Sequence, residues 1–147
     1  MRALLDVNVL IALLDSSHAH HSVATAWLRN NLEPGWASCP ITQNGCIRIL
    51  SQSAYPMSAT PADVAQRLGD AVADPAHQFW PDDINLLDAG ALQWDRLLSG
   101  RHLTDLYLLL IAVRHEARLV TFDGNIPLHI ATGAQPHHLC VIETHIH

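Results

Sequence analysis

Short apolar runs alternate with segments of helical pattern along the whole chain, and this alternation restricts the fold more than any other feature of the sequence. Runs that suit short buried strands lie at residues 3–5, 36–38, 78–80, 118–121 and 139–142. Helices are predicted at residues 9–14, 18–31, 42–51, 61–74, 87–98 and 105–116. Such alternation is typical of an α/β sandwich around a mainly parallel sheet. A length of 147 residues suits one domain, so we expect residues 1–147 to form a single unit.

The predicted helix starts rest on residues that can accept hydrogen bonds from the free amides of a first helical turn. Asn8, Thr42 and Thr104 are the expected caps of the helices that follow them. Thr60 followed by Pro61 is a strong start, because proline suits the first helical position. The helix at 105–116 is apolar on nearly all sides, which predicts a central, buried position.

Three aspartates stand where the predicted sheet would gather them. Asp6 closes the strand at 3–5, and Asp123 directly follows the run LVTF at 119–122. Asp105 lies in the first turn of the buried helix, whose N-terminus should point to the edge formed by the carboxyl ends of the strands. Singly, Asp6 could be a cap, Asp105 an acid at a helix dipole and Asp123 a turn residue. Together they predict one shared site.

A shared site of this kind needs a cation. Carboxylates at contact distance repel one another, and each raises the pKa of the others unless a positive charge lies between them. Mg²⁺ and Mn²⁺ take carboxylate oxygens, keep several waters and bind substrate phosphates. An ion of this kind can activate a water molecule and stabilise charge on a reacting phosphate. The sequence therefore favours metal-dependent chemistry on a phosphate ester.

Four sequence blocks carry a resemblance to a known family: LLDVNVLIALLD, ITQNGCIRIL, HLTDLYLLLIAV and LVTFDGNI, in this order. They resemble the PIN-domain ribonucleases of the VapC toxin type, and the later segment GAQPHHLCVI is similar to the end of that family. The resemblance implies a PIN-like three-layer α/β/α sandwich. It also implies a Mg²⁺- or Mn²⁺-dependent endoribonuclease toxin, a homodimer, and inhibition by a VapB-type antitoxin.

The resemblance also assigns roles to individual residues. It implies that Asp6, Asp105 and Asp123 are the catalytic acids and the metal ligands. It implies supporting roles for Thr121, as a hydroxyl beside the last acid, and for Asn8, as a polar neighbour of the first.

Gln43 is a departure from the family pattern. Many PIN domains have a glutamate at the start of the third helix, where this chain has Gln43. An amide oxygen carries no charge, so metal affinity should fall, although Gln43 could still hold a metal-bound water. Asp82 or Asp83 could compensate, but a solvated loop is the expected setting for both. A catalytically weakened PIN-fold module that binds RNA or protein therefore stands as the alternative function.

Three other kinds of enzyme fit the sequence poorly. A haloacid-dehalogenase-like phosphatase also has an aspartate after its first strand, but it needs a second acid where this chain has Asn8. It needs a lysine as well, and all eight basic residues here are arginine. The absence of lysine also excludes a P-loop and Schiff-base chemistry.

Charge bears on how RNA could bind. The net charge is −6 with neutral histidine, so no general positive field attracts a nucleic acid and any contact must be local. Arg48 and Arg101 flank the acidic blocks and are the candidate substrate-binding residues, because arginine pairs well with phosphate.

Cysteine and histidine usage points to no further site. Cys39, Cys46 and Cys140 form no CxxC pair, which favours reduced thiols in a cytoplasmic protein. No run approaches the roughly 20 apolar residues of a membrane span, so no membrane association is expected. Eleven histidines are many, but the spacings in the clusters at 18–21 and 137–147 do not match zinc motifs. We expect surface or packing roles for them.

Overall fold

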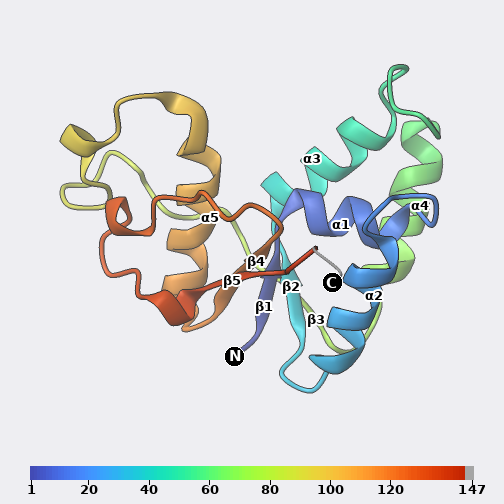
Figure 1. The fold of residues 1–147 in the computed structure, drawn as a ribbon, viewed down its shortest axis with the longest axis horizontal. Helices are drawn as coiled ribbons and strands as arrows, with labels where there is room; N and C mark the ends of the chain where they lie inside the picture. Colours follow the sequence, from blue (N-terminus) through green and yellow to red (C-terminus); the bar gives the residue numbers. More distant parts are fainter. Residues whose placement is uncertain (145–147) are drawn as a thin grey trace.

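The structure is a computed structural model that describes residues 1–144, and its centre is a parallel sheet of five strands (Figure 1). The strands are β1 Ala3–Leu5, β2 Trp36–Ser38, β3 His77–Phe79, β4 Arg118–Thr121 and β5 Leu139–Val141. Their order across the sheet is β3-β2-β1-β4-β5, and every neighbouring pair is parallel. The expected parallel sheet is confirmed. β1 occupies its middle, so the residue after β1 lies at the centre of the carboxyl edge.

Five helices cover the two faces of this sheet. They are α1 Val7–Leu14, α2 His21–Asn30, α3 Pro40–Leu50, α4 Pro61–Val72 and α5 Leu103–Arg114. Figure 1 shows α5 on one side of the strands and α1 to α4 on the other. The three-layer α/β/α arrangement is therefore confirmed.

The core consists of two apolar clusters, one on each face of the sheet. Successive residues of a strand point to opposite faces, so Leu4 packs in the cluster of α5 and Leu5 in the cluster of α1 and α3. All seven residues of α5 from Leu106 to Ala112 are buried, which confirms the central position expected for this helix. Strands that are apolar on both faces are what a sheet covered by helices requires.

Three of the four predicted helix caps are wrong, and the fourth is confirmed. Asp6, not Asn8, is the N-cap of α1, because its Oδ1 accepts a hydrogen bond from the amide of Val7 at 2.7 Å. Helix α3 begins at Pro40, so Thr42 lies inside its first turn, where its Oγ1 accepts from the amide of Cys39. Helix α5 begins one residue before Thr104. The start at Thr60 is confirmed: its hydroxyl accepts from the amide of Asp63 at 3.1 Å.

The helix predicted at residues 87–98 is wrong. This stretch belongs to an irregular connection between β3 and α5, with short 3₁₀ turns at Trp94–Arg96 and Gly100–His102. Leu87 is 84% exposed and Leu98 is 92% exposed, so the apolar residues at its two ends bury no common face. Gly90 adopts a φ of +84°, a left-handed conformation that a helix cannot contain.

Smaller differences concern the ends of two other elements. Helix α2 begins at His21 rather than at residue 18, because residues 15–20 form turns in which the ring of His18 accepts from the amide of His20. Strand β3 is shifted by one residue from its predicted position. No helix in the part of the chain that the structure describes has the length and apolar character needed to cross a membrane.

Helices α1 and α3 approach each other closely at Gly45. A Cβ atom at this position would lie only 2.8 Å from Cγ2 of Val7, so the contact requires glycine. Val7 directly follows Asp6, and the spacing of the two helices is therefore set beside the first candidate acid.

Candidate active site

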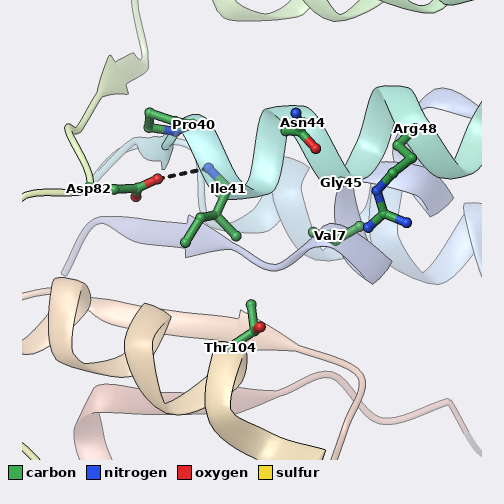
Figure 2. Close-up of a pocket in the computed structure, with 8 residues that line it drawn as sticks. All are labelled: Val7, Pro40, Ile41, Asn44, Gly45, Arg48, Asp82 and Thr104. Atoms are coloured by element: carbon green, nitrogen blue, oxygen red, sulfur yellow. Dashed lines mark hydrogen bonds between the residues drawn. The ribbon is translucent and has the colours of Figure 1, made fainter. Parts of the chain in front are cut away.

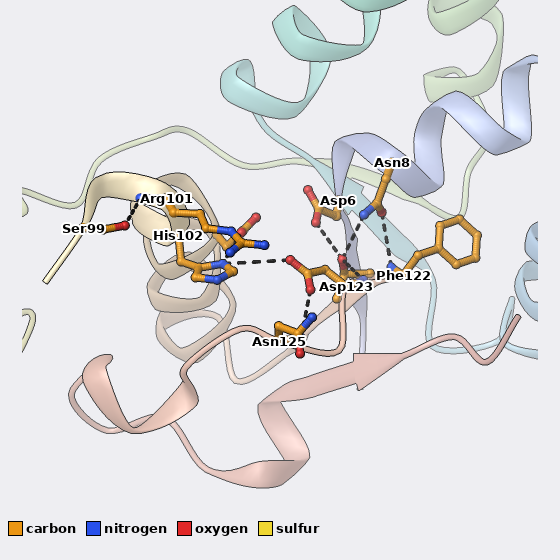
Figure 3. A network of polar contacts seen from close by, with 10 residues as sticks. Asp6, Asn8, Ser99, Arg101, His102, Phe122, Asp123 and Asn125 are labelled. Carbon is orange, nitrogen blue, oxygen red and sulfur yellow. Dashed lines mark hydrogen bonds and ion pairs between the residues drawn. The ribbon is translucent and has the colours of Figure 1, made fainter. Parts of the chain in front are cut away.

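Asp6 lies at the carboxyl end of β1 and is almost fully buried, with 6% of its surface exposed. One oxygen accepts the hydrogen bond from the amide of Val7, as a helix cap does. The other accepts a hydrogen bond from the hydroxyl of Thr121 at 2.8 Å (Figure 3). Both carboxylate oxygens therefore have a fixed orientation.

Thr121 connects the first strand to the last acid. Its Oγ1 donates to Asp6 and also accepts from the side-chain amide of Asn8 at 3.2 Å and from the backbone amide of Asp123 at 3.1 Å. The carbonyl oxygen of Asn8 in turn accepts from the amide of Phe122 at 3.3 Å. Figure 3 shows that this network holds the end of β1, the start of α1 and the end of β4 together. Thr121 and Asn8 are thus neighbours of Asp6 in space.

Asp105 and Asp123 come together around a third side chain, His102. Nδ1 of His102 lies 3.2 Å from Oδ2 of Asp105 and 3.9 Å from Oδ2 of Asp123. One ligand-type atom from each of these residues lies within 4.8 Å of the other two. Asp6 is not part of this compact group. We refer to His102, Asp105 and Asp123 as the His-Asp-Asp cluster.

His102 is the site residue that sequence reasoning missed. It lies three residues before Asp105, in the block HLTDLYLLLIAV. Because residues three apart share a helix face, this spacing could have indicated a pair at the start of α5. This signal is weak because the chain has eleven histidines, and those at 18, 20 and 21 form a denser cluster.

Burial and neighbouring negative charges raise the pKa values of Asp6 and Asp105. Burial raises the pKa of Asp6 to about 6, and the negative charges of Asp105 and Asp123 add to this shift, although the hydrogen bond from Thr121 opposes it. Burial also raises the pKa of Asp105, with Asp123 contributing and His102 opposing. The predicted mutual repulsion of the carboxylates is present in this geometry.

The residues present fit a divalent cation. Two acids of the site have raised pKa values, and a positive charge between carboxylates removes the cause of that shift. The donors are carboxylate oxygens and one imidazole nitrogen. The carboxylate oxygens suit both Mg²⁺ and Mn²⁺, and an imidazole nitrogen is a ligand of first-row transition ions, to which Mn²⁺ belongs.

Gln43 lies away from direct contact with the acids. Its side-chain amide donates to the hydroxyl of Ser38 at 3.0 Å, and this hydroxyl also lies 2.7 Å from Nε2 of His77. Ser38 ends β2, which pairs with β1, so Gln43 lies next to the strand that carries Asp6. An amide in this place adds a polar group near the site without adding charge.

A groove of about 400 Å³ lies between α1, α3 and α5 (Figure 2). Its walls come from the start of α1, one face of α3, the start of α5 and the connection after β3, and they contain Val7, Pro40, Ile41, Asn44, Gly45, Arg48, Asp82 and Thr104. The lining residues Val7 and Thr104 directly neighbour Asp6 and Asp105 in the sequence, but the acids themselves do not line the groove. Arg48 is thus brought to this groove.

The remaining charged candidates occupy different settings. Arg101 is exposed on the 3₁₀ turn beside His102 (Figure 3). Asp82 borders the groove and accepts a hydrogen bond from the amide of Ile41 at 2.9 Å, which caps α3 from a distant part of the chain. Asp83 makes an exposed ion pair with Arg114 at 3.0 Å.

The histidine-rich segments contribute no group with the geometry of a metal site among the residues that the structure describes. Around residue 20, the ring of His20 packs on Phe122 and that of His21 bonds to the carbonyl of Ala12. His145 and His147 lie outside the described residues. Cys39, Cys46 and Cys140 are free thiols, as expected.

Comparison with known proteins identifies close relatives. The family model described as "PIN domain" matches residues 3–129. Ribonuclease VapC44 of Mycobacterium tuberculosis (strain CDC 1551 / Oshkosh) is 46% identical over 142 residues, which cover 97% of this chain and 100% of the relative. Ribonuclease VapC39 of the same strain is 44% identical over 125 residues, which cover 84% of this chain and 90% of the relative. Ribonuclease VapC38 of strain ATCC 25618 / H37Rv is 38% identical over 125 residues, 84% and 86% of the two chains.

Proposed function

Because the chain belongs to the PIN-domain family, among its VapC-type ribonucleases, we propose that it is an endoribonuclease toxin that hydrolyses RNA with a divalent metal ion. The observation that carries this proposal is the meeting of Asp105 and Asp123 in one cluster, with Asp6 coupled to both of them by charge. The acids come from three distant parts of the sequence. Helix capping by Asp6 does not explain why acids from three distant segments meet at one place.

Asp6, Asp105 and Asp123 would hold the ion. Their carboxylate oxygens are the ligands that Mg²⁺ and Mn²⁺ prefer, and we propose one of these two metals as the cofactor. Such an ion supplies an activated water molecule and stabilises the negative charge that develops on the reacting phosphate.

The other residues of the site prepare the acids and the substrate. The hydroxyl of Thr121 stabilises the ionised form of Asp6 and fixes its orientation, and Asn8 fixes Thr121. We propose that Arg48, in the groove, and Arg101, beside the cluster, contact RNA phosphates. Two local cations would offset the negative charge of the protein where the RNA chain enters.

Cleavage of RNA by the purified full chain tests this function. Addition of Mg²⁺ or Mn²⁺ should produce fragments with 5′-phosphate and 3′-hydroxyl ends, because an activated water attacks phosphorus and the 3′ oxygen leaves with a proton. EDTA should prevent cleavage. Asp105→Asn should lower the rate by at least about a hundredfold if this acid acts on charge in the transition state. Equal cleavage by the variant and the parent would remove the proposed catalytic role.

A non-catalytic function is the second candidate, and one observation favours it. Gln43 is neutral and engaged with Ser38, so the position beside β1 carries no fourth acid. A weakened site of this kind would bind RNA or protein without cutting it. Saturable RNA binding in the presence of Mn²⁺, together with no cleavage in any divalent metal, would support this candidate against the enzyme.

The names of the relatives suggest partners as well. We propose a VapB-type antitoxin, which would block the site most directly by inserting an arginine among the acids. A homodimer is part of the same proposal, and light scattering of the isolated chain tests it. Three free thiols are consistent with action in the cytoplasm.

A further inference from the structure

His102 contributes a ring nitrogen to the His-Asp-Asp cluster, and the function proposed above assigns metal binding to the three aspartates alone. Nδ1 lies 3.2 Å from a carboxylate oxygen of Asp105 and 3.9 Å from one of Asp123. The side chain is 18% exposed, so the ring is largely enclosed with the acids rather than extended into solvent.

The backbone explains why the ring faces the acids. His102 ends the 3₁₀ turn Gly100–His102 and is the residue from which α5 begins, but its side chain makes no capping hydrogen bond to the helix. The turn is stabilised by Ser99, whose hydroxyl accepts from the amide of Arg101 at 3.2 Å. Asp105 follows three residues later and therefore lies on the same face as His102. Asp123 reaches the pair from the end of β4.

We propose that His102 is a nitrogen ligand of the divalent metal, binding through Nδ1 beside Asp105 and Asp123, and that it shifts the metal preference of the site from Mg²⁺ toward Mn²⁺. This inference rests on the proposed metal-dependent function and deepens it by assigning a ligand and a metal preference. The three donor atoms already lie within 4.8 Å of one another, a separation that one ion can bridge.

The chemistry of the donors gives the metal preference. An imidazole nitrogen without its proton offers a lone pair to a cation, in the same direction in which it otherwise donates a hydrogen bond. Mg²⁺ selects oxygen ligands and gives up its waters reluctantly, whereas imidazole suits first-row transition ions. A neutral ring adds a donor beside the carboxylates without adding negative charge.

A purely structural role for His102 makes a different prediction. In that case the ring only orients Asp105 through the hydrogen bond at 3.2 Å, and no metal–nitrogen bond forms. His102→Asn separates the two roles, because the asparagine amide can still donate to Asp105 from nearly the same place but provides no ring nitrogen. Loss of cleavage alone would not distinguish these roles, so the test measures the metal itself.

The experiment binds Mn²⁺ alone to the full chain, without RNA, at one fixed pH. Pulsed electron paramagnetic resonance of the bound ion should detect a directly coordinated nitrogen in the parent, and this signal should disappear in His102→Asn. The Mn²⁺ affinity of the variant should fall at least about tenfold, because mutation of a residue that only hydrogen-bonds to a metal ligand already lowers metal affinity by about that factor. The Mg²⁺ affinity, measured by competition, should fall much less.

His129→Asn is the matched control, because His129 is an exposed histidine outside the cluster. Its nitrogen signal and Mn²⁺ affinity should equal those of the parent. A parent without nitrogen coupling, or a signal that persists in His102→Asn, overturns the role of His102 alone. A parent that binds no Mn²⁺, or whose Mn²⁺ affinity is the same in Asp105→Asn, contradicts the metal-dependent function itself.

Discussion

The hydroxyl of Thr121 donates a hydrogen bond of 2.8 Å to the carboxylate of Asp6, and both side chains are buried. The bond joins the carboxyl ends of β1 and β4, two neighbouring strands that are 115 positions apart in the sequence. It is the strongest of the contacts that oppose the raised pKa of Asp6. Stability and ionisation at this edge of the sheet are therefore coupled through one hydroxyl group.

Thr121→Val removes this hydroxyl while keeping the shape of the side chain. We expect the free energy of unfolding to fall by about 1–3 kcal/mol, because Asp6, Asn8 and the amide of Asp123 all lose a buried partner. The pKa of Asp6 should rise further, so the pH at which metal-dependent cleavage begins should move upward. Urea unfolding and a pH–rate profile measure the two effects. Thr121→Ser keeps the hydroxyl. If its free energy of unfolding fell as much as that of Thr121→Val, the role of the hydrogen bond would be contradicted.

The raised pKa of Asp6 predicts how stability depends on pH without metal. The pKa of Asp6 is about 6 in the folded protein against an ordinary value of 3.8, so between these pH values the folded state binds more protons than the unfolded state. The contribution of Asp6 to the free energy of unfolding is therefore highest below pH 4 and falls by about 3 kcal/mol as pH rises through 6.

The comparison of the parent with Asp6→Asn isolates this effect. Urea unfolding in EDTA should show that the stability of the parent relative to the variant decreases from pH 4 to pH 7. Excess Mn²⁺ at pH 7 should recover stability in the parent, because an ion that binds only the folded state stabilises it. Parallel pH curves for the two proteins would show that Asp6 ionises normally.

Two adjacent acids after β3 provide a test of helix capping from a distance. Asp82 accepts a hydrogen bond from the amide of Ile41 at the start of α3, whereas Asp83 only pairs with Arg114 at the surface. Asp82→Ala should lower the free energy of unfolding by about 1 kcal/mol, the usual worth of a helix cap. Asp83→Ala should change it by less than about 0.5 kcal/mol, as exposed ion pairs do. Equal losses in thermal unfolding would argue against the cap.

Gln43→Glu tests whether the position beside β1 belongs to the metal site. A carboxylate there would add a negative charge next to the strand that carries Asp6, so we expect Mn²⁺ to bind at least about tenfold more tightly. Isothermal titration calorimetry on the full chain measures this. Gln43→Ala, which removes the bond to Ser38 without adding charge, should leave the affinity close to that of the parent. Unchanged affinity in Gln43→Glu would show that this side chain does not face the ion.

The architecture was predictable because its signals are local and repeated. The strands β1 and β4 are short and apolar, and α5 is apolar on nearly all sides, so both kinds of element need to be covered by other elements. The carboxyl ends of parallel strands share one edge, and this rule alone indicated that Asp6 and Asp123 lie near each other.

The errors lie where tertiary contacts replace local ones. Asp6 rather than Asn8 caps α1, because Asn8 is used by Thr121 and Phe122 from β4. The segment at 87–98 buries Leu92 but leaves Leu87 and Leu98 exposed, so its apolar residues do not form one buried helix face, and the sequence pattern does not reveal that. His102 was missed because its spacing to Asp105 is a weak signal among eleven histidines, and its second partner, Asp123, is brought to it only by the fold.

Gly45 has a consequence for how this protein can be altered. Any side chain there would press on Val7, whose amide is bonded to the Asp6 carboxylate, and would push apart two walls of the groove. A single methyl group added at Gly45 on α3 would therefore change the position and the pKa of Asp6 without contacting it. The absence of a side chain at Gly45 thus sets the distance between α1 and α3.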